Sequence, residues 1–407
     1  MHPLLPSLLL GLTFATVGAP APVERTTRAP APVDPTTSVA DPVEQTRLEV
    51  VSRLDSELAR LVDDPAEYDR LVAAECRSFP EGDLFPYTLA VLAWAGLAEG
   101  ERKPADLARM ERLLELAERP VSQRTSAPEG RLDRLSTYRD QATYLCQLNL
   151  ALAAFVAAGG SGRLVELHET LSGVILSDLE KAAGRPLNSF PSYTWPFDTV
   201  PCLLSIADYS PREGARLSSR VQEVLDRHLA WIEESGLDAA TGLPVSRVHP
   251  ETFAVSEVPR GCDLSWRLAL LEPIAPDKAR EWYGKYVKSF WRERFLAAGF
   301  AEWPGDGTRR EDVDSGPIVM GIGGTATALG IAAAAVFSDA FRLARLVPQV
   351  ASTHAAIAER SAEGESFMPG LPVRLRADRY TGFLYGDVVL FHALTWEKTA
   401  RLLRPGR

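Results

Sequence analysis

The feature that most constrains the fold is the spacing of the apolar residues, which recur at helical intervals along almost the whole chain beyond residue 46. No segment alternates apolar and polar residues as a half-buried strand would. Most of the periodic segments end in Gly, Pro or a polar cluster, which are the usual helix stop signals. About a dozen helices are expected, and the chain is therefore predicted to be all-α.

Two kinds of helix alternate along the chain. Charged, amphipathic helices are predicted at 216–234 and 277–294, and short, mostly apolar helices at 201–208, 264–271 and 325–336. An apolar helix has to be buried on every side, whereas an amphipathic helix covers it from outside. The alternation predicts an (α/α) toroid of about six helical hairpins, in which the ends of the inner helices line a central cleft.

The N-terminal 46 residues are expected to lie outside this toroid. Residues 1–19 hold a short apolar stretch typical of a signal peptide, ending in the small residues Val-Gly-Ala. The stretch 20–46 is rich in Pro and Thr and too poor in large apolar residues to pack, which predicts a disordered linker. Residues 47–407 are predicted to form a single catalytic domain, the toroid. We expect export to the periplasm or the exterior, with a retained N-terminal membrane anchor as the alternative.

Charge and motif content exclude several classes of function. The net charge is −10 and no Lys/Arg-rich run occurs, which argues against a nucleic-acid partner because phosphate binding needs clustered cations. No HExxH motif or His/Cys cluster is present, so neither a metal nor another cofactor is expected. The expected partner is a small-molecule substrate, and a homo-oligomer remains open. Disulfides and buried free thiols are both open for the four cysteines, which are Cys76, Cys146, Cys202 and Cys262.

Polar motifs lie directly before the apolar helices. Three of them read SYTWPFD, SRVHPETFAVSEVPRGCD and AEWPGDGTRREDVDSGP, and a fourth reads SFPEGDLFPY. In a toroid these loops meet at one mouth of the inner layer, so their side chains are expected to face the cleft. The candidate catalytic residues are the carboxylates Asp198, Glu302, Asp312 and Asp314.

These carboxylates are suited to acid/base chemistry. Asp198 follows a Trp-Pro pair that puts an apolar wall beside it, and burial raises the pKa of a carboxylic acid so that it can donate a proton. Asp312 and Asp314 lie two residues apart, and like charges held close push one pKa up, which provides an acid and a base. Glu302 again stands beside Trp and Pro. Helix capping is the alternative role for the aspartates.

Six further residues of these loops are expected to bind substrate. The aromatic side chains would stack on a flat or ring-shaped ligand, and the arginines would hold a carboxylate or an anionic group, unless they are salt-bridged scaffolding. The histidine is held by the following proline and is otherwise a turn residue. The candidates are Tyr87, Trp195, Arg247, His249, Arg260 and Trp303.

The same stretches resemble linalool dehydratase/isomerase and its relatives, which are α/α toroid enzymes. The likeness covers roughly residues 185–345, including the block ending LSIADY, the segment SRVHPETFAV, and the DVDSG block that leads into a Gly/Ala-rich helix. Where that family looks to place acid/base cysteines, this sequence has Asp198, with Cys202 a helical turn further on. Gln147 stands where the family has a histidine.

The resemblance implies a cofactor-free acid/base enzyme, a lyase or isomerase that dehydrates or isomerises a small apolar alcohol with carboxylates in place of cysteines. A glycoside hydrolase is the first alternative, because α/α toroids often hold paired carboxylates flanked by tryptophans. The second alternative is a non-catalytic exported scaffold or binding module whose acidic loops cap helices. In that last case the carboxylates would be bound by backbone N–H groups and would not meet in one cavity.

Overall fold

The computed structural model describes residues 41–97, 104–209, 218–294, 297–305, 311–362 and 375–406. The predicted signal peptide at 1–19 and most of the predicted linker at 20–46 lie outside the described residues. Residues 41–407 form one compact unit. The first helix, α1 (Pro42–Val62), begins inside the stretch predicted as linker, because Asp41 caps it by accepting a hydrogen bond from the backbone N–H of Val43.

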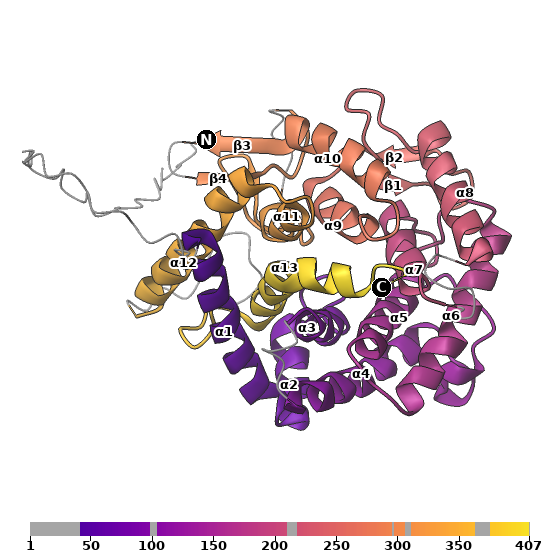
Figure 1. The fold of residues 1–407 in the computed structure, drawn as a ribbon, viewed down its shortest axis with the longest axis horizontal. Helices are drawn as coiled ribbons and strands as arrows, with labels where there is room; N and C mark the ends of the chain where they lie inside the picture. Colours follow the sequence, from indigo (N-terminus) through magenta and orange to yellow (C-terminus); the bar gives the residue numbers. More distant parts are fainter. Residues whose placement is uncertain are drawn as a thin grey trace, which may run out of the picture. The chain divides into compact units, whose positions relative to one another are not determined.

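Six helices form an inner ring. Each packs against the next along the chain, and the last closes the ring by packing against the first (Figure 1). Their residues are apolar nearly all round and buried, as the sequence pattern predicts for helices covered on every side. The inner helices are α3 (Phe85–Ala95), α5 (Ala142–Ala157), α7 (Thr199–Ser205), α9 (Gly261–Leu271), α11 (Gly324–Val336) and α13 (Leu384–Leu402).

The amphipathic helices surround this ring and pair with the inner helices in hairpins (Figure 1). In the helix at 219–235, the buried residues recur at the spacing of a single helical face; they are Val221, Val224, Leu225, His228 and Ile232. The predicted (α/α) toroid is therefore confirmed. With α1, the outer helices are α4 (Pro104–Arg124), α6 (Arg163–Ala182), α8 (Ser219–Ser235), α10 (Pro276–Phe290) and α12 (Ala340–Ala362).

The loops between these helices contain short elements that the periodicity does not predict. They are α2 (Pro65–Leu71), the π-helical turn η1 (Val72–Cys76), and the 3₁₀ turns η2 (Pro128–Gly130), η3 (Leu132–Arg134) and η4 (Pro196–Asp198). Three antiparallel two-stranded sheets pair β1 (Arg247–Val248) with β2 (Val255–Glu257), β3 (Trp291–Arg294) with β4 (Ala297–Phe300), and β5 (Ile318–Val319) with β6 (Ile322–Gly323).

The hairpin of β3 and β4 corrects the helix predicted at 277–294, since α10 ends at Phe290 and Trp291 is already extended. Contacts distant in sequence hold the hairpin. The Trp291 ring packs edge-on against Phe300 with centroids 5.2 Å apart. The side-chain amide of Gln349, from α12, binds both the backbone N–H and the carbonyl of Ala298. These partners lie outside the local window on which the prediction depends.

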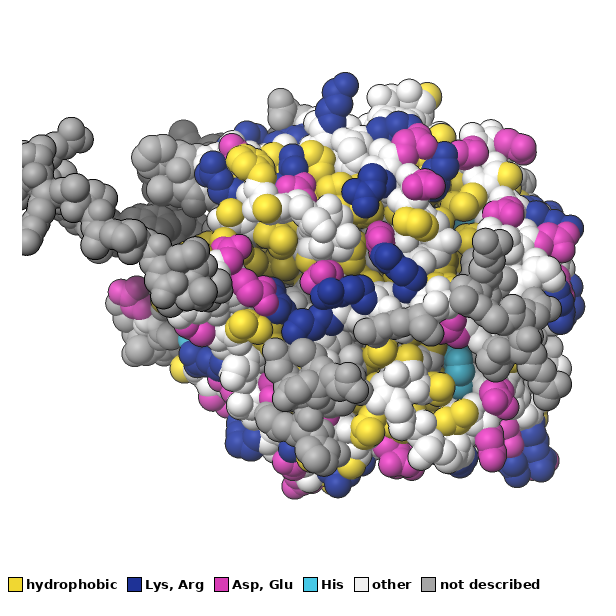
Figure 2. Space-filling model, viewed as in Figure 1, with side chains coloured by type: hydrophobic (Ala, Val, Ile, Leu, Met, Phe, Trp, Pro, Cys, Tyr) yellow, Lys and Arg dark blue, Asp and Glu magenta, His cyan; other side chains and the backbone are white. Residues whose placement is uncertain are grey.

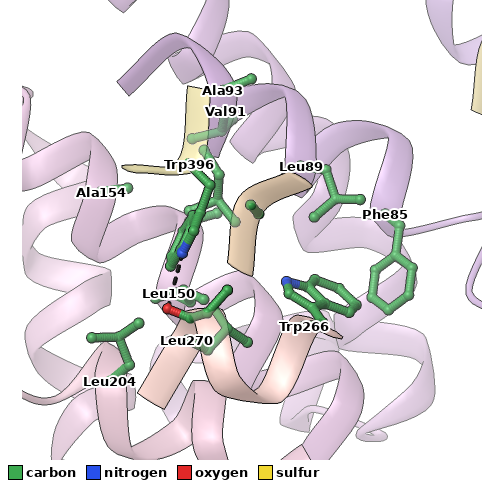
Figure 3. Packing of buried hydrophobic residues seen from close by; sticks show 14 of the residues in the cluster. Phe85, Leu89, Val91, Ala93, Leu150, Ala154, Leu204, Trp266, Leu270 and Trp396 are labelled. Atoms are coloured by element: carbon green, nitrogen blue, oxygen red, sulfur yellow. Dashed lines mark hydrogen bonds between the residues drawn. The ribbon is translucent and has the colours of Figure 1, made fainter. Parts of the chain in front are cut away.

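The centre of the ring is filled with side chains (Figure 3). Phe85 of α3 packs edge-on against Trp266 of α9, with ring centroids 5.3 Å apart. The Trp396 indole of α13 donates a hydrogen bond of 3.0 Å to the carbonyl of Ala269. The inner ring therefore has a solid core, and a ligand site has to lie at an end of the ring, where loops meet.

A disulfide and a group of hydrogen-bonded polar side chains join α5, α6 and α7. Cys146 of α5 and Cys202 of α7 are bonded to each other, while Cys76 and Cys262 are free. Beside the disulfide, the buried Asn149 side chain donates to the hydroxyls of Ser172 and Ser205 at 3.1 and 3.0 Å. Since a buried polar group costs free energy unless it is hydrogen-bonded, this network specifies how the three helices pack.

Candidate active site

The loops that precede the inner helices meet at one mouth of the ring. The Tyr385 hydroxyl, at the start of α13, donates to the Pro80 carbonyl before α3 at 3.0 Å. At another junction of the ring, the N–H of Gly261 at the start of α9 donates to the carbonyl of Glu302 before α11 at 2.8 Å. The four polar motifs of the sequence all belong to these loops. We therefore consider this mouth as the candidate site.

Arg260 organises one half of the mouth. Its Nε donates to Glu302 Oε1 and its Nη2 to Asp312 Oδ1, both at 2.7 Å, and its Nη1 lies 3.5 Å from Asp314 Oδ2. The guanidinium also stacks over the Trp303 ring, with 4.7 Å between the Cζ atom and the ring centroid. The structure thus brings together five of the residues that the sequence predicts as site residues.

The three carboxylates around Arg260 differ in their freedom to react. Glu302 is buried, and its oxygens also accept from the backbone N–H and the thiol of Cys262 at 3.1 Å each. Burial raises the pKa of Glu302 to about 7, opposed by Arg260. Asp312 accepts further bonds from the N–H groups of Asp314 and Ser315. Glu302 and Asp312 therefore act as supports for Arg260 and for the loop.

The side chains of Asp312 and Asp314 both reach solvent, with exposed fractions of 42% and 46%, but Asp314 lies farther from the Arg260 guanidinium. Desolvation raises the pKa of Asp314, and the Arg260 guanidinium opposes this shift. Asp312 shows the reverse balance: burial acts to raise its pKa, but the hydrogen bond and charge of Arg260, together with the backbone N–H groups of Ser315 and Asp314, lower it. The pair therefore holds two carboxylates whose pKa values are displaced in opposite directions, chiefly by burial at Asp314 and by Arg260 and backbone N–H groups at Asp312.

Asp198 lies on the other side of the mouth, at the end of η4 and directly before α7, and it does not contact Arg260 in the described residues. Its carboxylate is buried, with the hydroxyls of Ser189 and Thr143 close to it. Burial raises its pKa to about 6, while the two hydroxyls act in the opposite direction. Its carboxylate makes no side-chain capping bond to the helix that follows.

Glu81 links the two halves and is not among the site residues that the sequence predicts. It precedes α3 in the SFPEGDLFPY stretch and has a left-handed backbone with φ of 43°. Burial, together with the nearby carboxylates of Asp198 and Asp314, raises its pKa to about 8. The local signal is the same as for Asp198 and Glu302, an acidic side chain next to Pro and close to an aromatic residue.

A cavity opens beside Glu81, between the loop before α3, the end of α4 and the start of α5. Its volume is about 330 Å³, at the lower end of the roughly 300 to 1,000 Å³ typical of small-molecule sites. Acidic, basic and aromatic side chains line it, among them Glu81, Asp83, Arg124 and Tyr144. The Tyr144 hydroxyl donates to Asp83 Oδ1 at 2.6 Å, and Arg124 stacks over the Tyr144 ring.

The structure places the remaining predicted residues less centrally. Tyr87 lines the cavity, but its hydroxyl donates to Asp69 Oδ1 at 2.5 Å. His249 is exposed, and its Nδ1 accepts from the backbone N–H groups of Glu251 and Thr252, as a turn residue does. Arg247 is half-buried on β1. Trp195 lies in the loop before α7 and stacks on Tyr193.

Among the described residues, no group of three or more His, Cys, Asp or Glu side chains is placed to hold a metal ion. None of the described helices is long and apolar enough to span a membrane. On the face shown in Figure 2, acidic and basic side chains are interspersed with hydrophobic ones, without a continuous basic patch in the coloured part. This face offers no surface of the kind that nucleic-acid binding requires.

Fold and site together define an all-α, (α/α) toroid protein with a cluster of carboxylates at one mouth. Solved structures with the same arrangement of helices are α-1,6-mannanases of glycoside hydrolase family 76. GH76A of Salegentibacter sp. HEL1_6 has a TM-score of 0.50 and 10% sequence identity, over 86% of this chain and 98% of the mannanase. An inactive variant of the same enzyme, in complex with α-1,6-mannotetrose, has a TM-score of 0.51 and 9% identity, over 87% and 99%.

At this level of identity the comparison establishes the fold. No protein-family model and no curated protein sequence matches the chain.

These matches correct the resemblance to linalool dehydratase/isomerase, which is wrong: the toroids that match are mannanases. The prediction of a lyase or isomerase acting on an apolar alcohol is wrong with it. Cys202, near the position where that family looks to place an acid/base cysteine, is bonded to Cys146. The walls beside Glu81 are also charged and aromatic, rather than the closed apolar pocket that such an alcohol would require.

Proposed function

We propose that the protein is a glycoside hydrolase that cleaves an α-linked oligosaccharide, with Glu81 as the general acid and Asp198 as its ionised partner. The observation that carries the proposal is the pair of displaced pKa values at this mouth. The pKa of Glu81 is about 8 and that of Asp198 about 6, and the Asp198 carboxylate itself acts on Glu81. Between these values one carboxyl group is neutral and the other ionised, which is what glycoside hydrolysis requires.

The roles follow from the surroundings of each group. Glu81 lines the open cavity, so its proton can reach the glycosidic oxygen of a bound sugar. The hydroxyls of Ser189 and Thr143 stabilise the Asp198 carboxylate in its ionised form, in which it can act as base or nucleophile. Asp314, beside Arg260, adds negative charge near Glu81 and so favours its protonated form.

The structural relatives support the class of substrate. The Salegentibacter mannanase forms a complex with α-1,6-mannotetrose as an inactive variant in which two consecutive aspartates are replaced by alanine. In the present sequence the only consecutive aspartates are Asp63 and Asp64. Asp63 is bound by Arg109 and Asp64 caps α2, so neither belongs to the mouth. We therefore assign the acid and its partner to carboxylates on separate loops, and α-1,6-linked mannosides are the first substrates to test.

The test is hydrolysis by the purified protein of α-1,6-mannotetrose and of other α- and β-linked tetrasaccharides, followed by chromatography of the products. Glu81→Gln and Asp198→Asn are each expected to lower kcat by about 100- to 10,000-fold, the usual contribution of a general acid or base. Glu129→Gln is the matched control, because Glu129 is also a glutamate with positive φ, 53°, but is exposed in the η2 turn. Full activity of Glu81→Gln would refute the assignment, and absence of any saccharide hydrolysis would refute the function.

The proposal includes export, for which the signal-like sequence at 1–19 and the Cys146–Cys202 disulfide are the supporting observations. Structural disulfides persist in oxidising compartments such as the periplasm and the exterior. Expression with the native N-terminus, followed by mass spectrometry of the protein outside the cytoplasm, is expected to find a chain that starts near residue 20. A chain retained in the cytoplasm with its first residues intact would contradict export.

A further inference from the structure

Four aromatic side chains next to the cavity form a continuous row, here called the aromatic strip: Tyr144, Phe190, Trp195 and Tyr193. The Tyr144 and Phe190 rings meet edge-on with centroids 6.1 Å apart, and Phe190 meets Trp195 edge-on at 5.9 Å. Trp195 and Tyr193 are stacked at 5.6 Å with 17° between their planes. The strip therefore joins the start of α5 to the loop before α7.

The strip runs from the cavity to solvent. Tyr144 lines the cavity that also contains Glu81. At the other end, Tyr193 is 51% exposed, and Trp195 and Phe190 are half-buried between the two ends. A large aromatic ring that is half exposed and stacked on a second ring contributes little to the core. Its exposure at the rim of a polar cleft is typical of ligand binding.

The strip is rigid because backbone and side-chain bonds fix its loop. Phe190 and Tyr193 form a β-bridge, and the N–H of Trp195 donates to Ser189 Oγ at 2.8 Å. The Thr194 hydroxyl donates to Asn188 Oδ1 at 2.6 Å. The Ser189 hydroxyl also lowers the pKa of Asp198, so it lies close to that carboxylate. The aromatic strip and a proposed reacting group therefore adjoin the same residue of one loop.

The groups beside the strip indicate a neutral, hydroxyl-rich ligand. Arg124 stacks over Tyr144, Asp83 accepts from the Tyr144 hydroxyl, and Asp140 accepts from Asn188 Nδ2 at 3.1 Å. Charges of both signs flank the rings, which favours hydroxyl groups that donate and accept hydrogen bonds over an ion of one sign. A sugar unit combines such hydroxyls with an apolar C–H face that packs on an aromatic ring.

We propose that the aromatic strip binds successive units of an oligosaccharide chain, one end of which lies in the cavity beside Glu81. The protein then recognises a saccharide of several units, and units beyond those in the cavity are held at the Trp195 and Tyr193 end. The position of the cleaved bond rests on the proposed function, whereas binding to the strip does not require hydrolysis.

The test is the binding of α-1,6-mannobiose and α-1,6-mannotetrose, measured by calorimetry on the full chain carrying Glu81→Gln to prevent turnover. Adding Tyr193→Ala is expected to weaken tetrasaccharide binding about 3- to 10-fold, the effect of one aromatic stacking contact, and to leave the disaccharide unchanged. Tyr193→Phe should retain the affinity. Val255→Ala is the matched control, because Val255 is also 51% exposed in a loop of the same mouth.

The outcomes separate the strip from the proposed reaction. If the Glu81→Gln protein binds the tetrasaccharide equally well with and without Tyr193→Ala, saccharide binding by the strip is overturned, even if the wild-type protein hydrolyses this tetrasaccharide. A Tyr193-dependent, length-dependent affinity without hydrolysis would support the strip and refute the glycoside hydrolase. An equal loss of affinity for both saccharides would show a disturbed loop rather than a distal binding surface, and would overturn the inference. The inference would also be overturned if the parent protein bound neither of these saccharides nor cellotetraose, a β-linked tetrasaccharide to be tested beside them.

Discussion

Glu81 and Asp198 are both carboxyl groups at one mouth, and their surroundings make them chemically different. Asp198 is buried next to two hydroxyl groups that stabilise its charge, whereas Glu81 is half-buried beside other acids. Proximity of like charge therefore adds to burial at Glu81, while hydrogen bonding opposes burial at Asp198. Environment provides most of the separation between the two pKa values, because the ordinary values of the two residue types, 4.5 for Glu and 3.8 for Asp, differ much less.

The pH dependence of hydrolysis follows from these two values. Activity needs Asp198 ionised, which requires a pH above about 6, and Glu81 protonated, which requires a pH below about 8. The plot of kcat/KM against pH is expected to be a bell with limbs near pH 6 and pH 8. Removing a neighbouring charge with Asp314→Asn should move the basic limb to lower pH. A flat profile from pH 5 to 9 would refute the assignment of both roles.

The residues predicted from the sequence include Asp198 but not Glu81, although both stand close to Pro and an aromatic residue. The Trp-Pro pair beside Asp198 is a local feature, so its consequence, burial of the carboxylate, can be anticipated. The pKa of Glu81 depends on Asp198 and Asp314, which are distant in sequence and come close only when the ring closes. Likewise, spacing alone pairs Asp312 with Asp314, but Arg260, which separates their roles, comes from another loop.

At the scale of elements, glycines in two helices show how the inner layer is packed. A Cβ atom on Gly330, within α11, would lie 2.4 Å from Cδ2 of Phe300. The Phe300 ring cannot move away readily, because it is fully buried and stacked on Tyr286 at 4.7 Å. A Cβ atom on Gly284, within the outer helix α10, would meet no atom within 4 Å. The inner helix therefore needs its glycine for close packing.

These two glycines give opposite predictions for the same substitution. Gly330→Ala is expected to lower the free energy of unfolding by about 1–3 kcal/mol, because overpacking outweighs the gain in helix propensity. Gly284→Ala should raise it by about 0.5–1 kcal/mol, because alanine loses less backbone entropy in a helix. Urea unfolding monitored by circular dichroism measures both. Stabilisation by Gly330→Ala would show that α11 does not pack closely against Phe300.

For the whole molecule, several buried carboxyl groups have raised pKa values. Burial raises the pKa of Glu81 to about 8, of Glu302 and Asp387 to about 7, and of Asp198 to about 6. At a pH above the ordinary carboxyl pKa, the native state binds more protons at these groups than the unfolded state does. The contribution of these groups to the free energy of unfolding therefore falls as the pH rises from about 4 towards 8.

Three buried histidines act in the opposite direction at lower pH. Burial lowers the pKa of His168 and His228 to about 4 and that of His392 to about 3. Below the ordinary value of 6.5 the unfolded state binds more protons at these rings, so their contribution to stability is lost as the pH falls from 6.5 towards 3. Well above pH 6.5 these histidines no longer change the stability, whereas the raised carboxyl groups still do.

The melting temperature is therefore expected to fall between pH 6.5 and pH 8.5, and scanning calorimetry across this range measures it. Glu81→Gln should reduce this fall, since it removes the group with the highest raised pKa. Glu129→Gln, at an exposed position, should leave the pH dependence unchanged. A melting temperature that rises across this range would contradict the burial of these carboxyl groups.

The sequence by itself determined the class of fold and its two layers, because helical periodicity and amphipathicity are properties of short windows of the chain. It also placed the acidic motifs before the inner helices, from which their meeting at one mouth follows. Only the tertiary structure decided the Cys146–Cys202 bond, the β3–β4 hairpin and the carboxylates that share Arg260. These contacts join residues far apart in sequence, and their geometry is set by closure of the ring of helices, which no local pattern encodes.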